Sequence, residues 1–139
     1  MMENAKKLLE SGGYTCVLCG DGMTLTATER GVRPLAGWLR EGKDLRGFRA
    51  ADKVVGKATA FLYCLLGVVE VYGRVMSRQA LAVLREHGIA AEYDVLVEHI
   101  TNRSGTGMCP FEEAVWEVGE PAQAWQIIRK KLDATQAGA

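Results

Sequence analysis

The chain has 139 residues, a length typical of one domain, and its 17 basic and 17 acidic side chains give a formal net charge of zero. Hydrophobic residues make up 48% and charged residues 24%, which excludes a disordered, collagen-like or coiled-coil chain. Because the charges cancel, a general electrostatic attraction to nucleic acid is not expected, and nucleic acid is excluded as a partner.

The N-terminal part of the chain is predicted to form a helix and then a β-hairpin. The helix covers 3–10 and ends at a pair of glycines, the residue type that commonly follows a last helical turn. Strands over 14–19 and 24–28 flank the Gly-Asp-Gly sequence at 20–22, whose length and residue types are typical of a hairpin turn. A short helix over 34–40 follows, with proline near its start.

The middle of the chain holds its most apolar segment, for which we predict a helix over 51–66. After Lys57 this segment is apolar almost all round, which indicates a central helix buried on every side. A strand over 68–75 follows, and Ser77 is placed to cap a helix that runs to 87.

The last part of the chain continues the alternation of strands and helices. Strands are predicted over 89–93 and 95–100, then a Gly/Ser/Thr loop over 102–109. Prolines begin two more helices, over 110–118 and 121–132, and residues 134–139 are expected to be a frayed tail. Strands alternating with helices predict a single α/β domain over 1–139, a three-layer sandwich with a mixed β-sheet between helices.

The chain shows neither a membrane span nor a secretion signal. Its longest apolar run, over 58–69, is well short of the roughly 18–20 residues that a span needs. Residues 1–11 are polar and lack the apolar core of a signal peptide. We therefore expect a cytoplasmic protein with no membrane partner, whose four cysteines are reduced thiols.

The four cysteines call for different interpretations. Alternation along the first strand would put Cys16 and Cys19 on opposite faces, so we interpret this pair as buried structural thiols rather than a redox or metal site. Cys64 lies among apolar residues of the central helix and is expected in the core. Cys109 immediately precedes Pro110, at the N-cap of a predicted helix, where a thiolate is stabilised.

The start of the predicted central helix is the first candidate site. Lys53 would lie in its first turn, where the helix dipole disfavours a cation, and Lys57 one turn later on the same face. Two interpretations stay open. Either Asp52 caps the helix and both lysines reach solvent, or Asp52, Lys53 and Lys57 bind an anion or a carboxylate partner.

The loop before the next-to-last helix is the second candidate site, because free N–H groups at a helix N-terminus bind anions such as phosphate. A loop that only makes a sharp turn would account for its two glycines, but less well for its other residues taken together. We therefore favour a binding loop. The residues of this loop expected to contact ligand are Asn102, Arg103, Ser104, Gly105, Thr106 and Gly107.

The two sites together resemble an uncharacterised prokaryotic group, domain-of-unknown-function family 1893. The resemblance covers the chain from Lys6 to about Leu132, and its most specific parts are ADKVVGKA over 51–58 and NRSGTGMCP over 102–110. It implies a cytidine-deaminase-like fold, a mixed sheet sandwiched by helices. It implies no reaction, because no activity is established for the family.

The deaminase-like fold permits an alignment with zinc deaminases, which use His or Cys, then Ala, then Glu at a helix start and Pro-Cys-x-x-Cys at another. The alignment puts Ala51 at the first zinc ligand, Lys53 at the catalytic glutamate, and Cys109 and Glu112 at the two cysteines. Of the three nitrogen or sulfur ligands that a zinc deaminase uses, only the thiol of Cys109 then remains. The resemblance therefore implies a site with no metal, no cofactor and no hydrolytic deamination.

These arguments leave three functional hypotheses. The leading one is a binding module that holds a small anionic metabolite, phosphate- or nucleotide-like, at Lys53 and the loop over 103–109. The alternative is an enzyme in which Cys109 is the nucleophile, Lys53 favours its thiolate and Glu112 shuttles protons. A third hypothesis is a homo-oligomer. The aromatic residues that could anchor its interface are Trp38, Phe48, Trp116 and Trp125.

Overall fold

The structure is a computed structural model that describes residues 2–137. In chain order its elements are α1 (Met2–Ser11), β1 (Cys16–Gly20), β2 (Met23–Ala27), α2 (Arg33–Arg40), β3 (Arg49–Val55), α3 (Lys57–Leu66), β4 (Glu70–Ser77), α4 (Arg78–Glu86), β5 (Ala90–Val97), α5 (Pro110–Ala114) and α6 (Pro121–Ala137). None of the helices in this range is long and apolar enough to cross a membrane.

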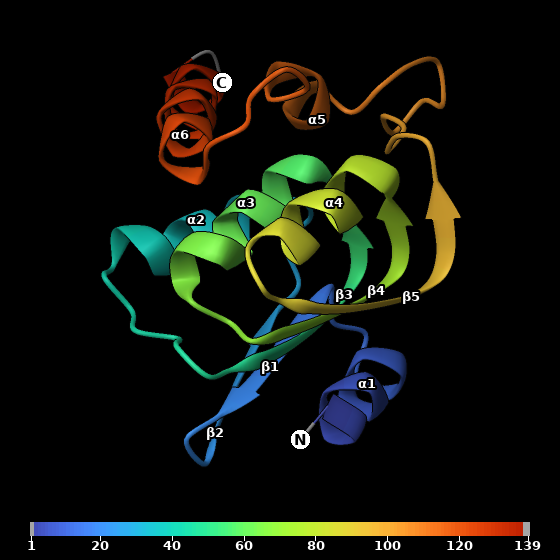
Figure 1. Cartoon of the computed structure of the whole chain (residues 1–139), viewed down its shortest axis with the longest axis vertical. Helices are drawn as coiled ribbons and strands as arrows, with labels where there is room; N and C mark the ends of the chain where they lie inside the picture. The colour runs from blue at the N-terminus through green and yellow to red at the C-terminus, as the bar shows by residue number, and fades with distance from the viewer. Residues whose placement is uncertain (1, 138–139) are drawn as a thin grey trace.

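The five strands form one mixed sheet, as predicted, in the order β2-β1-β3-β4-β5. The hairpin strand β1 is antiparallel to both β2 and β3, while β3, β4 and β5 are parallel to one another. Parallel neighbours need a crossover connection, which α3 and α4 provide (Figure 1). The carboxyl ends of β3, β4 and β5 therefore lie along the same edge of the sheet.

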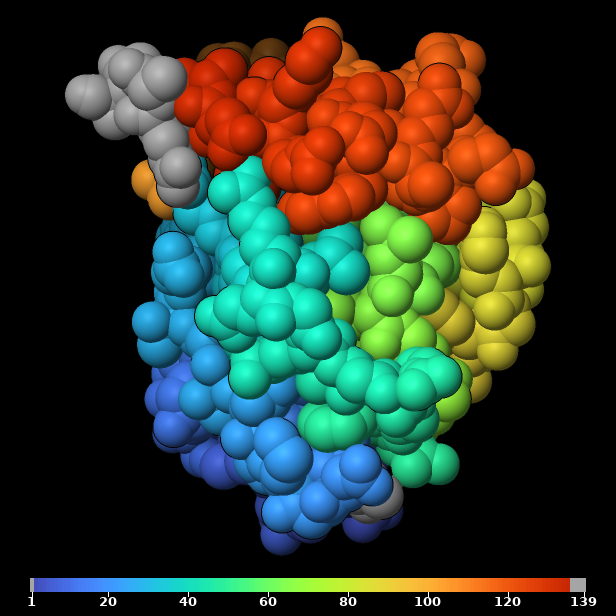
Figure 2. All heavy atoms as spheres, turned by 90° about the vertical axis from the view of Figure 1, so that its left-hand side faces the viewer, coloured from blue at the N-terminus to red at the C-terminus, as the bar shows by residue number. Residues whose placement is uncertain are grey.

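Helices cover both faces of the sheet, which confirms the predicted α/β sandwich. The helix α1 packs on β1 and β3 from one side, and α2, α3 and α4 lie on the other (Figure 1). Beyond them, α6 packs against α3 and lies at one end of the molecule, above the segments of α2 and α3 in Figure 2. The two faces of the sheet carry separate apolar clusters.

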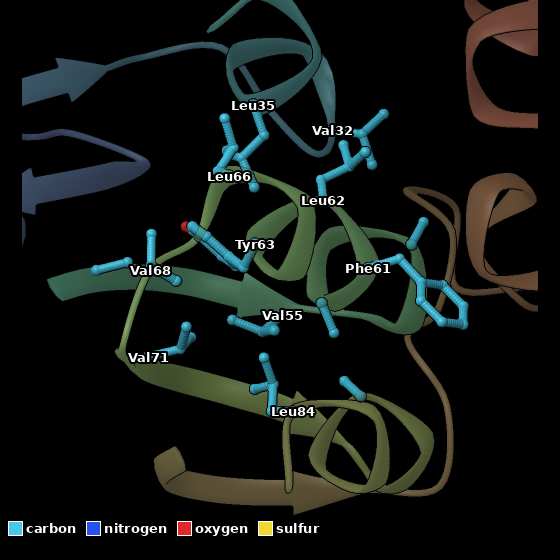
Figure 3. Close-up of a cluster of buried hydrophobic side chains, with 14 of the residues drawn as sticks. Val32, Leu35, Val55, Phe61, Leu62, Tyr63, Leu66, Val68, Val71 and Leu84 are labelled. Carbon is cyan, nitrogen blue, oxygen red and sulfur yellow. The ribbon is translucent and has the colours of Figure 1, made fainter. Parts of the chain in front are cut away.

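The larger cluster surrounds α3, which is buried nearly all round, as predicted. In Figure 3, Leu66 lies beside Leu35 of α2 and Leu62 beside Val32, while Val55 and Leu84 lie on the opposite side of the helix. The sheet covers one side of α3, and the helices α2, α4 and α6 pack against its other sides. Cys64 is half-buried at the rim of the cluster, so the expectation of a core position holds only in part for it.

The sequence prediction was wrong at the beginning of this helix. Residues 51–55 belong to the strand β3, and α3 begins at Lys57 after Gly56, whose φ of −93° and ψ of 179° are extended. The strand β3 lies between β1 and β4, and Ala50, Ala51 and Val55 in it are fully buried. An interior strand covered on both faces lacks polar alternation, so its apolar run is easily mistaken for a helix.

Three further boundaries differ from the prediction. The strands expected over 89–93 and 95–100 are the single strand β5, and the helix expected over 110–118 ends at Ala114. The helix α6 continues to Ala137, so 134–137 are helical rather than frayed, while 138–139 lie outside the described residues.

Local signals in the sequence were accurate at two other places. The Ser77 hydroxyl accepts a hydrogen bond from the Ala80 N–H at 3.2 Å and caps α4 as predicted. Cys16 and Cys19 are buried in different apolar clusters, on opposite faces of the sheet, as predicted.

The aromatic residues considered as interface anchors differ in burial. Phe48 is buried in the core, so its assignment as an interface anchor was wrong, whereas Trp38, Trp116 and Trp125 are half-buried.

Candidate functional site

A pocket of about 880 Å³ lies at the carboxyl end of β3, beside the N-terminus of α3. Open α/β sheets commonly bind ligands outside the carboxyl ends of their parallel strands. Five separate parts of the chain meet here. The pocket is lined by Thr15 and by residues of 30–33, 52–59, 100–104 and 109–112.

The pocket brings together most of the site residues that were predicted from the sequence. Those that line it are Asp52, Lys53, Asn102, Arg103, Ser104, Cys109 and Glu112. The first two reach it from the end of a strand rather than from a helix start. The predicted ligand contacts that do not line it are Lys57, Gly105, Thr106 and Gly107.

Four basic residues line the pocket. Lys53 and Arg103 were predicted from the sequence as site residues, whereas Arg30 and Arg33 were not. Within residues 2–137, none of the four forms an ion pair. Arg30 and Arg33 come from the segment that leads into α2. A cluster of arginines around Gly31 was the available signal, but only the fold shows that this segment faces the end of β3.

Asp52 is the buried acid of the pocket, with its side chain 6% exposed. The Tyr63 hydroxyl donates a hydrogen bond to one carboxylate oxygen at 2.7 Å, and the Val54 N–H donates to the other at 3.3 Å. Burial raises the pKa of Asp52 to about 7, although these hydrogen bonds oppose the shift. Burial, together with the nearby Asp52 carboxylate, also raises the pKa of the Cys16 thiol well above its usual value.

Thr59 also lines the pocket and was not predicted from the sequence. Because it is four residues before Tyr63 in α3, the two side chains lie on the same face of the helix. Thr59 is only 5% exposed, and its hydroxyl forms no hydrogen bond with residues 2–137. Since no fully buried side-chain oxygen in this range lacks a partner, the hydroxyl oxygen itself is accessible. Its remaining exposure is toward the pocket.

Glu112 connects four parts of the fold and is 1% exposed. One of its carboxylate oxygens accepts hydrogen bonds from the Lys57 N–H at 2.6 Å and the Ser77 hydroxyl at 2.8 Å. The other oxygen accepts from the Ile100 N–H. Glu112 therefore supplies the cap that α3 lacks, since the N-cap residue Gly56 has no side chain to offer.

Glycine at position 56 is what lets this carboxylate approach the helix. A Cβ there would lie 3.3 Å from Glu112 Oε1 and 3.1 Å from Ile100 Cγ1, closer than ordinary side-chain contacts.

The side chain of Lys57 is directed away from the pocket. Its Nζ donates to the Trp116 carbonyl oxygen at 2.6 Å and lies over the ring of Phe61. Burial lowers the pKa of Lys57, while the surrounding acids oppose the shift.

The loop over 102–109 is a compact turn held by its own polar groups. The Asn102 N–H donates to the Gly107 carbonyl at 2.8 Å, and the Thr106 N–H donates to the Asn102 side chain at 3.0 Å. Gly105 has a φ of 71°, a left-handed conformation that favours glycine. Gly105, Thr106 and Gly107 thus fit the turn interpretation, while Arg103 and Ser104 reach the pocket.

Cys109 is the N-cap residue of α5, as predicted, and its side chain makes no capping hydrogen bond. It is half-buried in the lining of the pocket. No histidine lines the pocket, so among its described residues none offers an imidazole as a base for this thiol.

The alignment with zinc deaminases was wrong at its first motif, because Ala51 and Lys53 lie within β3 and not at the start of a helix. Across residues 2–137, no group of three or more His, Cys, Asp or Glu side chains is close enough together to hold a metal ion. A catalytic zinc needs about three protein ligands.

The absence of zinc remains a prediction. Elemental analysis of protein purified without an affinity metal is expected to give a zinc content near zero. One zinc per chain that is lost on Cys109→Ser would contradict this expectation and would identify Cys109 as a ligand.

Comparisons with known proteins agree with the family expected from the motifs. The sequence matches the family described as Domain of unknown function (DUF1893) over residues 4–132. The crystal structure of a DUF1893 family protein from Thermotoga maritima matches with a TM-score of 0.86 and 26% identity, covering 94% of this chain and 88% of that one. Among curated proteins, no match was found.

Two deaminases match the structure more loosely. A diaminohydroxyphosphoribosylaminopyrimidine deaminase/5-amino-6-(5-phosphoribosylamino)uracil reductase from Thermotoga maritima has a TM-score of 0.46 and 18% identity, over 82% of this chain and 39% of that one. The apo dCMP deaminase of cyanophage S-TIM5 has a TM-score of 0.42 and 15% identity, over 56% and 77% of the two chains. Because both TM-scores are below 0.5, we infer no property of the pocket from either deaminase.

Proposed function

This chain belongs to the family described as Domain of unknown function (DUF1893), and we propose that its pocket binds a small anionic ligand, phosphate- or nucleotide-like. The observation that carries the proposal is the set of four basic side chains, Arg30, Arg33, Lys53 and Arg103, none of which forms an ion pair within residues 2–137.

Charge and size both favour such a ligand. Like charges gathered around one cavity repel each other, and a bound anion removes that repulsion. Arginine offers a planar fork of N–H donors that matches phosphate, and three of the four cations are arginines. The volume of about 880 Å³ lies within the range of small-molecule sites.

The geometry favours this proposal over the alternative in which Cys109 is a nucleophile. That alternative assigns proton transfer to Glu112, but both oxygens of this carboxylate already accept hydrogen bonds from Lys57, Ser77 and Ile100. Glu112 is better explained as a structural cap. Cys109 then contributes to the pocket as a lining residue.

Binding is expected to depend on the cations of the pocket. We expect adenosine 5′-monophosphate or glucosamine 6-phosphate to bind the natural protein in isothermal titration calorimetry at low salt. The double variant Lys53→Ala/Arg103→Ala is expected to weaken binding about a hundredfold, ~2.7 kcal/mol, because it removes two charge-assisted contacts. The matched control is Arg85→Ala, which removes an exposed cation of α4 outside the pocket and should leave binding unchanged. Equal affinity of the double variant and the natural protein would refute the proposal.

A further inference from the structure

The inner surface of the pocket differs in chemistry from its cationic lining. Asp52 and Thr59, which we call the pocket floor, are 6% and 5% exposed, and both line the cavity. Polar side chains buried to this degree normally have hydrogen-bond partners. Thr59 has none among the described residues, and because no fully buried oxygen there is unsatisfied, its hydroxyl is accessible from the pocket and free to bond a ligand.

The carboxylate of the pocket floor is held in place and retains capacity to accept further hydrogen bonds. Tyr63 donates to one oxygen at 2.7 Å, and the Val54 N–H is 3.3 Å from the other. A carboxylate has about four acceptor positions, so each oxygen can accept at least one more hydrogen bond. Although four cations line the same pocket, no lysine or arginine of residues 2–137 forms an ion pair with Asp52.

These observations set the chemistry of the ligand's inner end. An anionic group placed against Asp52 would be repelled by the carboxylate. A group with no donor would keep water from the remaining acceptor positions of this carboxylate without replacing the hydrogen bonds of that water, which is unfavourable. The group that suits this position is an N–H donor. Three of the four basic residues, Arg30, Arg33 and Arg103, come from other segments of the chain than Asp52 and Thr59, and suit the anionic end.

We propose that this pocket selects a phosphomonoester that carries an amino group at its other end, with Asp52 accepting a hydrogen bond from that amino group and Thr59 bonding beside it. This inference rests on the proposed function, because it assigns the second end of the same ligand. Two sources share this chemistry: the phosphate ester of an amino sugar and the monophosphate of an amino-substituted nucleoside.

Two matched pairs of probes test the inference and distinguish the sources. The nucleotide pair is adenosine 5′-monophosphate and purine ribonucleoside 5′-monophosphate, which lacks only the amino group. The sugar pair is glucosamine 6-phosphate and 2-deoxyglucose 6-phosphate. In one pair, the amino member is expected to bind the natural protein at least tenfold more tightly, since sites built to bond an N–H group discriminate strongly against ligands that lack it.

The variants then assign this selectivity to the pocket floor. Asp52→Asn keeps the shape of the side chain with one acceptor oxygen instead of two, and should reduce the selectivity to less than threefold while inorganic phosphate binds as before. Thr59→Val should weaken the amino member at least threefold and decides the matter if Asp52→Asn does not fold. The matched control is Asp94→Asn, since Asp94 also accepts a tyrosine hydroxyl, that of Tyr72, but lies outside the pocket.

The outcomes separate this inference from the proposed function. If both members of each pair bind equally well, the inference is overturned and the anion site stands. Selectivity that survives both Asp52→Asn and Thr59→Val also overturns it. If neither inorganic phosphate nor any of the four phosphate esters binds the natural protein, the proposed function fails and the inference fails with it.

Discussion

Replacing Glu112 by alanine is expected to lower the free energy of unfolding by about 3–5 kcal/mol, because three donors in the interior would lose the side chain that accepts their hydrogen bonds. The side chain is 1% exposed and accepts hydrogen bonds from Lys57, Ser77 and Ile100. Without it, the N-terminus of α3 has no cap and two backbone N–H groups lose a partner. Urea denaturation measures the loss directly.

The neighbouring acid of the same helix is the control for Glu112→Ala. Glu113 also lies in the first turn of α5 but is exposed, so Glu113→Ala should change the free energy of unfolding by about 0.5 kcal/mol or less. Glu112→Gln keeps one acceptor oxygen and should lie between the two. Equal losses for Glu112→Ala and Glu113→Ala would show that the buried carboxylate does not hold these segments together.

The pH dependence of stability is expected to reveal Asp52. Burial raises its pKa from 3.8 to about 7. Below pH 4 the carboxyl is protonated in both states. Between about pH 4 and pH 7 the unfolded chain releases this proton while the folded protein keeps it, so the folded protein loses stability as the pH rises. The full loss, reached above pH 7, is about 4 kcal/mol.

A comparison with Asp52→Asn isolates this contribution from the other titrating groups. Urea denaturation at pH 4, 6 and 8 should show the variant gaining about 4 kcal/mol relative to the natural protein between the lowest and the highest pH. Asp94→Asn, an exposed site on β5, should show no such trend. A difference between Asp52→Asn and the natural protein that stays constant with pH would mean that Asp52 does not titrate in this range.

Most of the strands and helices could be predicted because their signals are local. Ser77 before a run of good helix formers marked the start of α4, and the apolar residues after Lys57 marked a helix covered on every side. The start of that helix could not be placed, because the interior strand β3 is equally apolar. Two adjacent β-branched residues, Val54 and Val55, followed by Gly56, were the signal for a strand and its end.

The site was harder to predict because its residues meet only through the fold. Glu112 reads as an ordinary acid in the first turn of a helix, and its role depends on Lys57, which lies 55 residues away along the chain. The pairing of Asp52 with Tyr63 requires β3 to end where α3 begins, so a continuous helix over 51–66 would have hidden it. The residue types indicated which acids and bases were candidates for the site. Only the tertiary contacts show which of them line the pocket and which cap a helix.

The position of α6 has a consequence for how the protein is made. This helix follows every strand of the sheet in the chain, yet its buried side chains Ala124, Ile128 and Leu132 complete the cluster around α3. Chains emerge from the ribosome with their N-terminal segments first. The whole sheet and α3 are therefore translated while the outer side of α3 still lacks its cover. During that interval the nascent chain exposes apolar surface to chaperones, and the core closes only after α6 has left the exit tunnel.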